Sequence, residues 1–257
     1  HKLQQANTTD AECNDGSDVI TLGPGDDVAF GGGVNDRIEG NDGRDIIVGD
    51  FAFYDTWPGS RFPKLLVTIK CESGGSDTLF GGDGDVDYLI GGTSDDIIRA
   101  DNNESIDSSN LDIVFGDHAE IRFYANESHK LQQAITIDAE CSTGGSDDIT
   151  LGPGDDWAFG GDLHDYIEGN EGRDIIMGDF GLYETWSGSR YPKRLLSINC
   201  SFGGEDSLYG GEGLVDILVG GSSDDTIHAD DSISSNSSNL DIVFGDHADV
   251  MFYANES

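Results

Sequence analysis

Aspartate residues at a fixed interval of nine are the feature of this sequence best suited to chemistry. In the first block the interval has no exception, and the residues are Asp18, Asp27, Asp36 and Asp45. An aliphatic residue follows each Asp by two positions, and Gly precedes each by two except where Val34 takes its place. Such turns offer carboxylate and carbonyl oxygens together, and Ca²⁺ accepts about six to eight oxygen ligands in flexible geometry. The pattern therefore predicts calcium binding.

Three further blocks repeat this arrangement with small insertions. Their equivalent residues are Asp77, Asp87, Asp96, Asp112, Asp147, Asp156, Asp165, Asp174, Asp206, Asp216, Asp225 and Asp241. All sixteen have Ile, Leu, Val or Ala two positions later, so we interpret them as ligands and not as ordinary turn residues. A Gly-Asp pair closes each block, and we predict that its Asp completes a calcium site at the block end: Asp50, Asp117, Asp179 and Asp246.

The nine-residue unit also predicts the element that positions these carboxylates. Its first six residues are rich in Gly, which supplies backbone conformations that other residues resist, and so form a turn. Its last three form a short strand whose middle aliphatic side chain points inward. Two units then make one coil of a flattened spiral, and successive coils stack as parallel strands. Clear examples are residues 31–39 (GGGVNDRIE), 91–99 (GGTSDDIIR) and 220–228 (GGSSDDTIH).

At these residues the chain resembles the RTX (repeats-in-toxin, haemolysin-type) calcium-binding nonapeptide family. The resemblance covers about 145 of the 257 residues. It implies a right-handed parallel β-roll in which calcium lies between turns one full coil apart, held by the nonapeptide Asp and by turn carbonyls. Carried over to this chain, it assigns the sixteen block Asp as ligands. Val34 and Leu163 depart from the pattern because they replace the turn Gly.

Longer repeats organise the nonapeptides. HKLQQA occurs twice and FYANES ends both halves, so residues 1–128 and 129–257 are tandem copies. Each copy holds two blocks, and a segment that reads as strand, turn and returning strand follows each block. The predicted fold class is all-β, a right-handed parallel β-roll or β-solenoid in four short blocks interrupted by these excursions, which either pair into a side sheet or form a lateral face against a neighbour. The blocks span about 13–50, 71–117, 141–179 and 200–246.

The charge balance requires cations. The chain carries 51 acidic and 13 basic residues, for a formal net charge of -38, yet 36% of its residues are hydrophobic and can form a core. Because self-repulsion at this charge opposes collapse, we expect calcium to be needed for folding. Two complete sites per block plus partial sites at block ends give about 8–16 Ca²⁺. Nucleic acid and anionic membranes are poor partners, and no apolar run reaches the roughly 18 residues of a membrane helix.

Cysteine and glycosylation signals predict an extracellular or cell-surface protein. Four Cys occupy equivalent positions and match no zinc spacing, so we predict disulfides among Cys13, Cys71, Cys141 and Cys200. We favour Cys13–Cys71 with Cys141–Cys200, and Cys71–Cys141 with the outer two pairing onward is the alternative. Sequons for N-linked glycans occur at Asn7, Asn103, Asn126, Asn199, Asn236 and Asn255. The chain starts without Met and ends where a third copy would begin, so we interpret it as an excerpt of a longer array.

We expect no enzyme. His118 and His247 occupy one repeated position, which Phe51 and Phe180 fill in the other two units, so we interpret the position as structural. Paired carboxylates are too abundant to mark an acid–base pair, and no Gly-Lys motif for phosphate occurs. Trp157, beside a turn Asp, is expected at the surface or at a strand edge.

Three functions are compatible with a calcium-dependent roll. The first is a calcium-stiffened structural segment of an extracellular filament, surface fibre or large adhesin, joined end to end with copies of itself. The second is an RTX-type module that folds on export and serves a larger secreted toxin or hydrolase. The third is an acidic matrix protein that binds mineral or ice, which requires a regular outward ladder of Thr or Asp.

Overall fold

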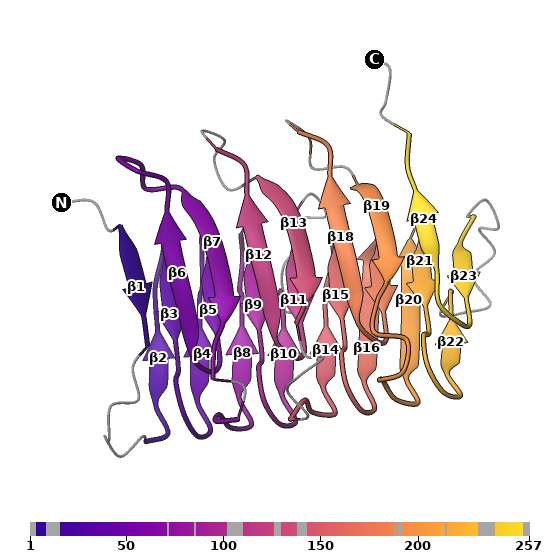
Figure 1. Ribbon diagram of the computed structural model, residues 1–257, viewed down its shortest axis with the longest axis horizontal. Coiled ribbons are helices and arrows are strands. Elements are labelled where there is room, and N and C mark those ends of the chain that lie inside the picture. The colour runs from indigo at the N-terminus through magenta and orange to yellow at the C-terminus, as the bar shows by residue number, and fades with distance from the viewer. Residues whose placement is uncertain are drawn as a thin grey trace.

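The computed structural model describes residues 4–8, 16–70, 72–84, 86–101, 110–125, 130–137, 143–187, 189, 192–213, 215–230 and 240–253. This described part is all-β, with its strands arranged in three sheets of eight that run the length of the molecule (Figure 1). It contains no helix, and so no helical segment long and apolar enough to cross a membrane.

Two of the sheets form the roll and contain the nonapeptide strands. The outer sheet consists of β2 (Val19–Thr21), β4 (Arg37–Glu39), β8 (Thr78–Phe80), β10 (Ile97–Arg99), β14 (Asp148–Thr150), β16 (Tyr166–Gly172), β20 (Ser207–Gly213) and β22 (Thr226–His228). The middle sheet consists of β3 (Val28–Phe30), β5 (Ile46–Val48), β9 (Tyr88–Ile90), β11 (Ile113–Phe115), β15 (Trp157–Phe159), β17 (Ile175–Met177), β21 (Ile217–Val219) and β23 (Ile242–Phe244). Every pairing in both sheets is parallel, which confirms the predicted β-roll.

Most of these strands have three residues because the rest of each nonapeptide is needed for the turn. The middle aliphatic residue of each strand stands beside its equivalent one coil away, so that Ile20 pairs with Ile38 and Ile38 with Leu79. These residues fill the space between the outer and middle sheets, where Leu79 and Leu89 are fully buried. Burying one such side chain is worth about 1.5–3 kcal/mol, so the stacked row is the main core of the roll.

The excursions interrupt the chain but not these sheets. Strand β4, before the first excursion, pairs directly with β8, after it, and β5 pairs with β9. The same holds at the boundary between the tandem copies, where β10 pairs with β14 and β11 with β15. It holds again at the third excursion, where β16 pairs with β20 and β17 with β21. The four blocks therefore stack into one continuous roll.

The excursions themselves form the third sheet, which we call the hairpin sheet. It consists of β1 (Gln5–Asn7), β6 (Ala52–Thr56), β7 (Pro63–Thr68), β12 (Ala119–Phe123), β13 (Leu131–Thr136), β18 (Gly181–Thr185), β19 (Pro192–Ser197) and β24 (Asp249–Met251). Its neighbouring strands are antiparallel throughout. Of the two arrangements expected for the excursions, the structure therefore adopts the side sheet, and the copy boundary falls in the β12–β13 hairpin.

The middle sheet is buried on both faces because the hairpin sheet packs against it. In β5, Ile47 contributes to the core shared with the outer sheet, whereas Ile46 and Val48 belong to a second core shared with the hairpin sheet. Trp157 lies in this second core, is only 4% exposed, and has its ring centroid 3.8 Å from that of Tyr183. The expectation that Trp157 lies at the surface is wrong, because a third sheet covers that side of the roll.

Candidate calcium sites

The turns of the roll bring the predicted Asp ligands into two rows. The first ladder lies in the turns that lead into the outer sheet and contains Asp18, Asp36, Asp77, Asp96, Asp147, Asp165, Asp206 and Asp225. The second ladder leads into the middle sheet and contains Asp27, Asp45, Asp87, Asp112, Asp156, Asp174, Asp216 and Asp241. All sixteen block Asp are thus placed in one of two continuous ladders.

One carboxylate oxygen of every ladder Asp except the first of each ladder, Asp18 and Asp27, holds neighbouring coils together. The backbone N–H of Asp77 donates to Oδ1 of Asp96 at 2.7 Å, and the N–H of Asp96 donates to Oδ1 of Asp147 at 2.8 Å. The same bond recurs at every step of both ladders, with the longest, from Asp216 to Asp241, at 3.1 Å. Because Oδ1 already accepts this bond, Oδ2 is the better candidate for a calcium ligand.

The second oxygen of most ladder carboxylates is buried without a hydrogen-bond donor. This holds for Oδ2 of Asp45, Asp77, Asp87, Asp96, Asp147, Asp156, Asp165, Asp174, Asp206 and Asp225. A buried carboxylate oxygen without a partner is costly unless a proton or a cation compensates its charge. These orphaned oxygens are the observation that fits calcium to the turns.

A backbone carbonyl converges on the same space as all of these oxygens except Oδ2 of Asp156. A Cβ added to Gly91 would collide with Oδ2 of Asp96 and with the carbonyl oxygen of Gly116, which lies one coil further on. We call this arrangement, in which a glycine lies against a carboxylate Oδ2 and a carbonyl oxygen, a cradle. Cradles of the first ladder occur at Gly31, Gly49, Gly91, Gly116, Gly160, Gly178 and Gly220, and those of the second ladder at Gly40, Gly81, Gly169 and Gly210. Only Gly leaves this space open, so the first glycine of the nonapeptide keeps room for an ion between carboxylate and carbonyl.

The ligand chemistry of these cradles suits calcium. Within the described residues, no group of three or more His, Cys, Asp or Glu side chains gathers as a metal cluster. Each cradle instead combines one carboxylate with backbone carbonyls from the turns. Ca²⁺ accepts such mixed oxygen sets, whereas Zn²⁺ prefers Cys and His, and Mg²⁺ demands stricter octahedral order.

Burial strongly affects the protonation of the ladder. Desolvation is the largest cause of every shift, and it raises the pKa of Asp77 and Asp147 to about 8 and that of Asp45 to about 6. Asp87 reaches a pKa of about 9 because the charge of Asp112 adds to its burial. In the absence of a cation, Asp77, Asp87 and Asp147 therefore resist ionisation at neutral pH, and a bound cation removes that penalty.

The Asp residues of the closing Gly-Asp pairs are arranged differently from the ladder. Asp50 accepts hydrogen bonds from the backbone N–H of Gly75 at 3.0 Å and from the N–H and hydroxyl of Thr93 at 2.6 and 2.8 Å. Asp117 likewise accepts from the N–H of Gly145 and Asp162. Their carboxylates thus fasten the point where an excursion leaves and rejoins the roll, a role that the sequence did not reveal.

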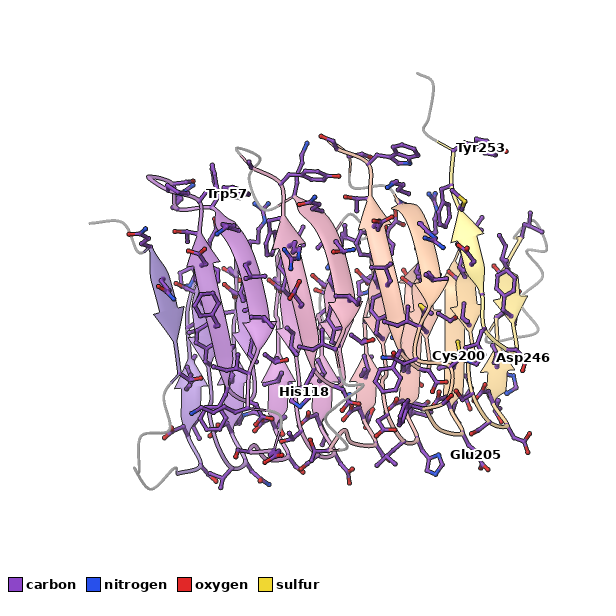
Figure 2. The ribbon with its side chains drawn as sticks, in the orientation of Figure 1. Trp57, His118, Cys200, Glu205, Asp246 and Tyr253 are labelled. Atoms are coloured by element: carbon purple, nitrogen blue, oxygen red, sulfur yellow. The ribbon has the colours of Figure 1, made fainter. Side chains whose placement is uncertain are left out.

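Of the other two closing Asp residues, only Asp179 has the same arrangement. Asp179 accepts from the N–H groups of Gly204 and Ser222, whereas Asp246 is exposed at the C-terminal end of the molecule (Figure 2). The assignment of all four as calcium ligands stays a prediction. Each interior carboxylate already accepts at least two backbone N–H groups.

Two departures from the turn pattern are accommodated by the backbone. Val34 and Leu163 take the place of Gly with φ of 60° and 65°, in the left-handed region that disfavours side chains.

A further feature, which the sequence analysis missed, lies beside a long loop of the second ladder. The Nδ2 of Asn110 donates to Asp101 Oδ2 at 2.6 Å and to Asp112 Oδ2 at 3.3 Å.

Most of the predicted disulfide and glycan positions lie outside the described residues. These are Cys13, Cys71 and Cys141 with Asn103, Asn126, Asn236 and Asn255. Within the described part, Cys200 is an exposed free thiol, and Asn7 is in β1. Asn199 is partly exposed with a φ of 55°. Disulfides and glycans therefore stay predictions.

The repeated His/Phe position lies where each excursion begins. Phe51, His118 and Phe180 are buried at this corner, and His247 is exposed in the last unit. Figure 2 shows His118 inside the molecule, at the base of the hairpin sheet. Burial of Phe at the equivalent corners agrees with the interpretation of the position as structural.

The comparison with known families agrees with this geometry. The model of the RTX calcium-binding nonapeptide repeat matches residues 14–38, 23–51, 73–103, 150–181 and 215–232. Among curated proteins and among solved structures, none matches the chain significantly. The matched segments contain twelve of the sixteen ladder carboxylates, and those outside them are Asp112, Asp147, Asp206 and Asp241. The matched nonapeptides are RTX calcium-binding repeats, and the chain therefore contains a calcium-binding repeat region of that family.

Proposed function

We propose that this chain is a calcium-stiffened structural segment of an extracellular filament, surface fibre or large adhesin. The observation that carries the proposal is the continuity of the two Asp ladders, which pass every excursion without a gap. A roll whose coils contact only their neighbours extends in one dimension, and ions between all its coils stiffen it along that axis. The RTX repeats are also typical of secreted proteins.

The ladders support an ion count within the range expected from the sequence. Each ladder of eight Asp has seven steps between coils, which makes fourteen steps. Glycine cradles occur at eleven of these steps, which supports about eleven inter-coil sites. This number falls within the expected 8–16. Eleven Ca²⁺ would offset about 22 of the 38 net negative charges.

Calcium removal tests the proposal directly. In excess chelator we expect the β-signal in circular dichroism to collapse and small-angle scattering to report an expanded chain. Restoring Ca²⁺ is expected to recover both, and an equal concentration of Mg²⁺ is expected to recover them less well. Spectra and scattering that are unchanged in chelator would contradict calcium-dependent folding.

The family match also supports a second candidate, a module that folds after export and serves a secreted toxin or hydrolase. This candidate differs from the structural one because it requires a separate catalytic domain on the same polypeptide. An ice- or mineral-binding role has less support, because the outward residues of the outer sheet are mixed. Val19 and Thr21 of β2 stand beside Arg37 and Glu39 of β4, so the outward positions form no repeating row of Thr or Asp.

A further inference from the structure

The two ends of the described molecule present open strand edges. At one end β1, β2 and β3 are the last strands of their sheets, and at the other end β24, β22 and β23 are. Figure 1 shows these two sets at opposite ends of the long axis. Exposed apolar side chains gather there: Val19 is 76% exposed at one end, and Leu240, Met251 and Tyr253 are 70%, 73% and 99% exposed at the other. Open edges with apolar side chains favour strand addition.

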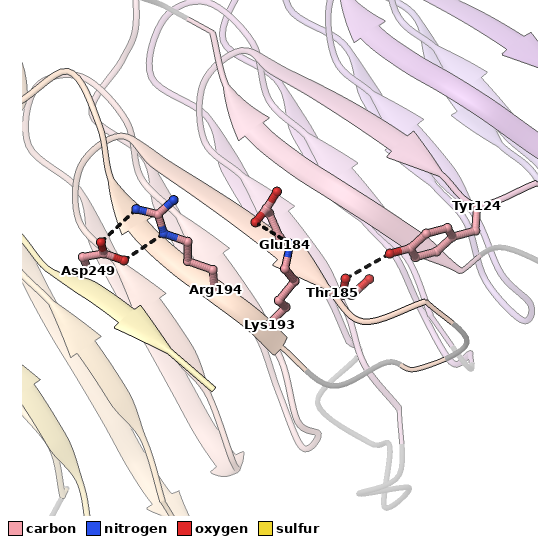
Figure 3. A network of polar contacts seen from close by, with 6 residues as sticks. All are labelled: Tyr124, Glu184, Thr185, Lys193, Arg194 and Asp249. Atoms are coloured by element: carbon pink, nitrogen blue, oxygen red, sulfur yellow. Dashed lines mark hydrogen bonds and ion pairs between the residues drawn. The ribbon is translucent and has the colours of Figure 1, made fainter. Parts of the chain in front are cut away.

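The interior boundary between the tandem copies shows how such edges are covered. There β10 pairs with β14, β11 with β15 and β12 with β13. Phe115 stacks on Phe159 across this joint with ring centroids 4.8 Å apart, and both are fully buried. The hydroxyl of Tyr124 donates to the carbonyl oxygen of Thr185 in the next hairpin at 3.0 Å (Figure 3).

The two ends of the molecule are the two halves of this same joint. The segment 116–128 (GDHAEIRFYANES) recurs as 245–257 (GDHADVMFYANES), so β24 is equivalent to β12. The segment HKLQQA recurs at the start of the chain, so β1 is equivalent to β13. The structure repeats the equivalence, since β1 pairs with β6 in the register in which β13 pairs with β18.

The glycine cradles at the ends are open in a complementary way. A Cβ at interior Gly116 would collide with Oδ2 of Asp147 and come within 2.7 Å of the carbonyl oxygen of Gly160. Its equivalent at the C-terminal end, Gly245, has no atom within 4 Å of that position. The missing carboxylate and carbonyl are those that Asp18 and Gly31 carry at the opposite end.

The same complementarity holds for the closing Asp. Interior Asp117 accepts backbone N–H groups of the following copy, from Gly145 and Asp162. Its equivalent Asp246 is exposed, and the matching backbone positions at the other end are Gly16 and Gly33. A pocket of about 860 Å³ is also bordered at this end by Phe252 and Tyr253.

From this complementarity we propose that a second copy of this chain docks head to tail onto the C-terminal end and completes a further calcium cradle there. The expected pairs are β24 with β1, β22 with β2 and β23 with β3, and Asp18 of the incoming copy supplies the carboxylate at Gly245. The proposal rests on the proposed function and specifies its partner. A following unit within a longer polypeptide would use the same joint.

The docking is expected to require calcium. Each copy carries a formal charge of -38, so two metal-free copies repel each other. The interior joint also has an ion pair from Arg99 to Asp148 at 3.0 Å, whereas the end-to-end joint has His228 and Val19 in these places. The intermolecular joint therefore depends more on the ions in its cradles than the interior joint does.

Two glycine variants test the joint by blocking one end each. Gly245→Ala blocks the tail, and Gly16→Ala blocks the head, because a Cβ at interior Gly145 would collide with the carbonyl of Ser94. Both positions are open in the single molecule, so neither variant should disturb its fold. With saturating Ca²⁺, sedimentation should show wild-type oligomers that grow with concentration, each variant alone as a monomer, and an equimolar mixture as dimers.

Tyr253→Ala should weaken wild-type association. Tyr253 is the equivalent of Tyr124, whose hydroxyl bonds to the next hairpin at the interior joint.

The controls separate the joint from the calcium function. Gly116→Ala, the interior equivalent, is expected to lower the thermal midpoint, whereas Gly245→Ala is expected to leave it unchanged. The docking proposal is overturned if the calcium-loaded wild type stays monomeric, if Gly245→Ala associates as the wild type does, or if the mixed variants form no dimers. Circular dichroism with and without chelator reports on calcium-dependent folding independently of all three outcomes.

Discussion

Most ladder carboxylates have two roles, one for each of their two oxygens. Oδ1 of Asp96 accepts the N–H of Asp77 and joins neighbouring coils, while Oδ2 is buried without a donor. The first role needs only an acceptor, which an amide also provides. The second needs a negative charge, which only a carboxylate provides. A substitution that keeps the shape and removes the charge can therefore separate coil pairing from ion binding.

Asp96→Asn is predicted to have opposite effects with and without calcium. In chelator at neutral pH it should stabilise any residual fold, because burial raises the pKa of Asp96 well above its usual value and ionisation is unfavourable there. With saturating Ca²⁺ it should bind fewer ions and lose stability, by about 1–3 kcal/mol, since a cation site loses its charged ligand. Calorimetric titration and thermal unfolding measure both. Asp83→Asn, an equal charge change at an exposed position, should leave both quantities close to wild type.

At the scale of elements, the excursions are attached to the roll by closing Asp residues, which the sequence analysis assigned to calcium. Asp50 follows the last strand of its block and accepts N–H groups from Gly75, on the returning segment, and from Thr93, in the next coil. It thus holds three stretches of chain at one corner. The hairpin sheet then covers the middle sheet and closes the second core.

Asp50→Ala is predicted to loosen the hairpin without lowering the calcium count. Loss of the acceptor leaves buried N–H groups unpaired, which costs about 1–3 kcal/mol of stability. Asp77→Asn is the matched comparison, because it lies in the ladder and should reduce the number of bound ions. Ion counting by mass spectrometry or titration decides between the two. A lower count for Asp50→Ala would show that Asp50 is a calcium ligand, as the sequence predicted.

At the scale of the whole molecule, protons and calcium compete for the same ladders. Burial raises the pKa of Asp77, Asp147 and Asp206 to about 8, far above the value of about 4 expected in an unfolded chain. Between these values the metal-free folded state binds more protons than the unfolded state. Its stability is therefore fully present below about pH 4 and is lost as the pH rises towards about 8.

The metal-free protein is accordingly predicted to be more folded near pH 4 than at pH 8. The affinity for calcium is predicted to increase over the same pH range. Calcium binding displaces protons from these carboxylates, so binding should tighten as the pH rises through the same window. Circular dichroism in chelator and calcium titrations at several pH values measure the two trends. Metal-free stability that increases from pH 4 to pH 8 would contradict the burial of the ladder.

The sequence by itself determined the local unit and its chemistry. The nine-residue period identified all sixteen ladder Asp, the turn glycines and the inward aliphatic row, because these depend on contacts within a coil or between coils of one block. The tertiary structure decided what happens across the excursions. Only closure of each hairpin fixes the register in which β4 meets β8, and this register makes the ladders continuous. It also gave Asp50 and Asp117 hydrogen-bond partners distant in sequence, and it buried Trp157 beneath a sheet whose position the period does not encode.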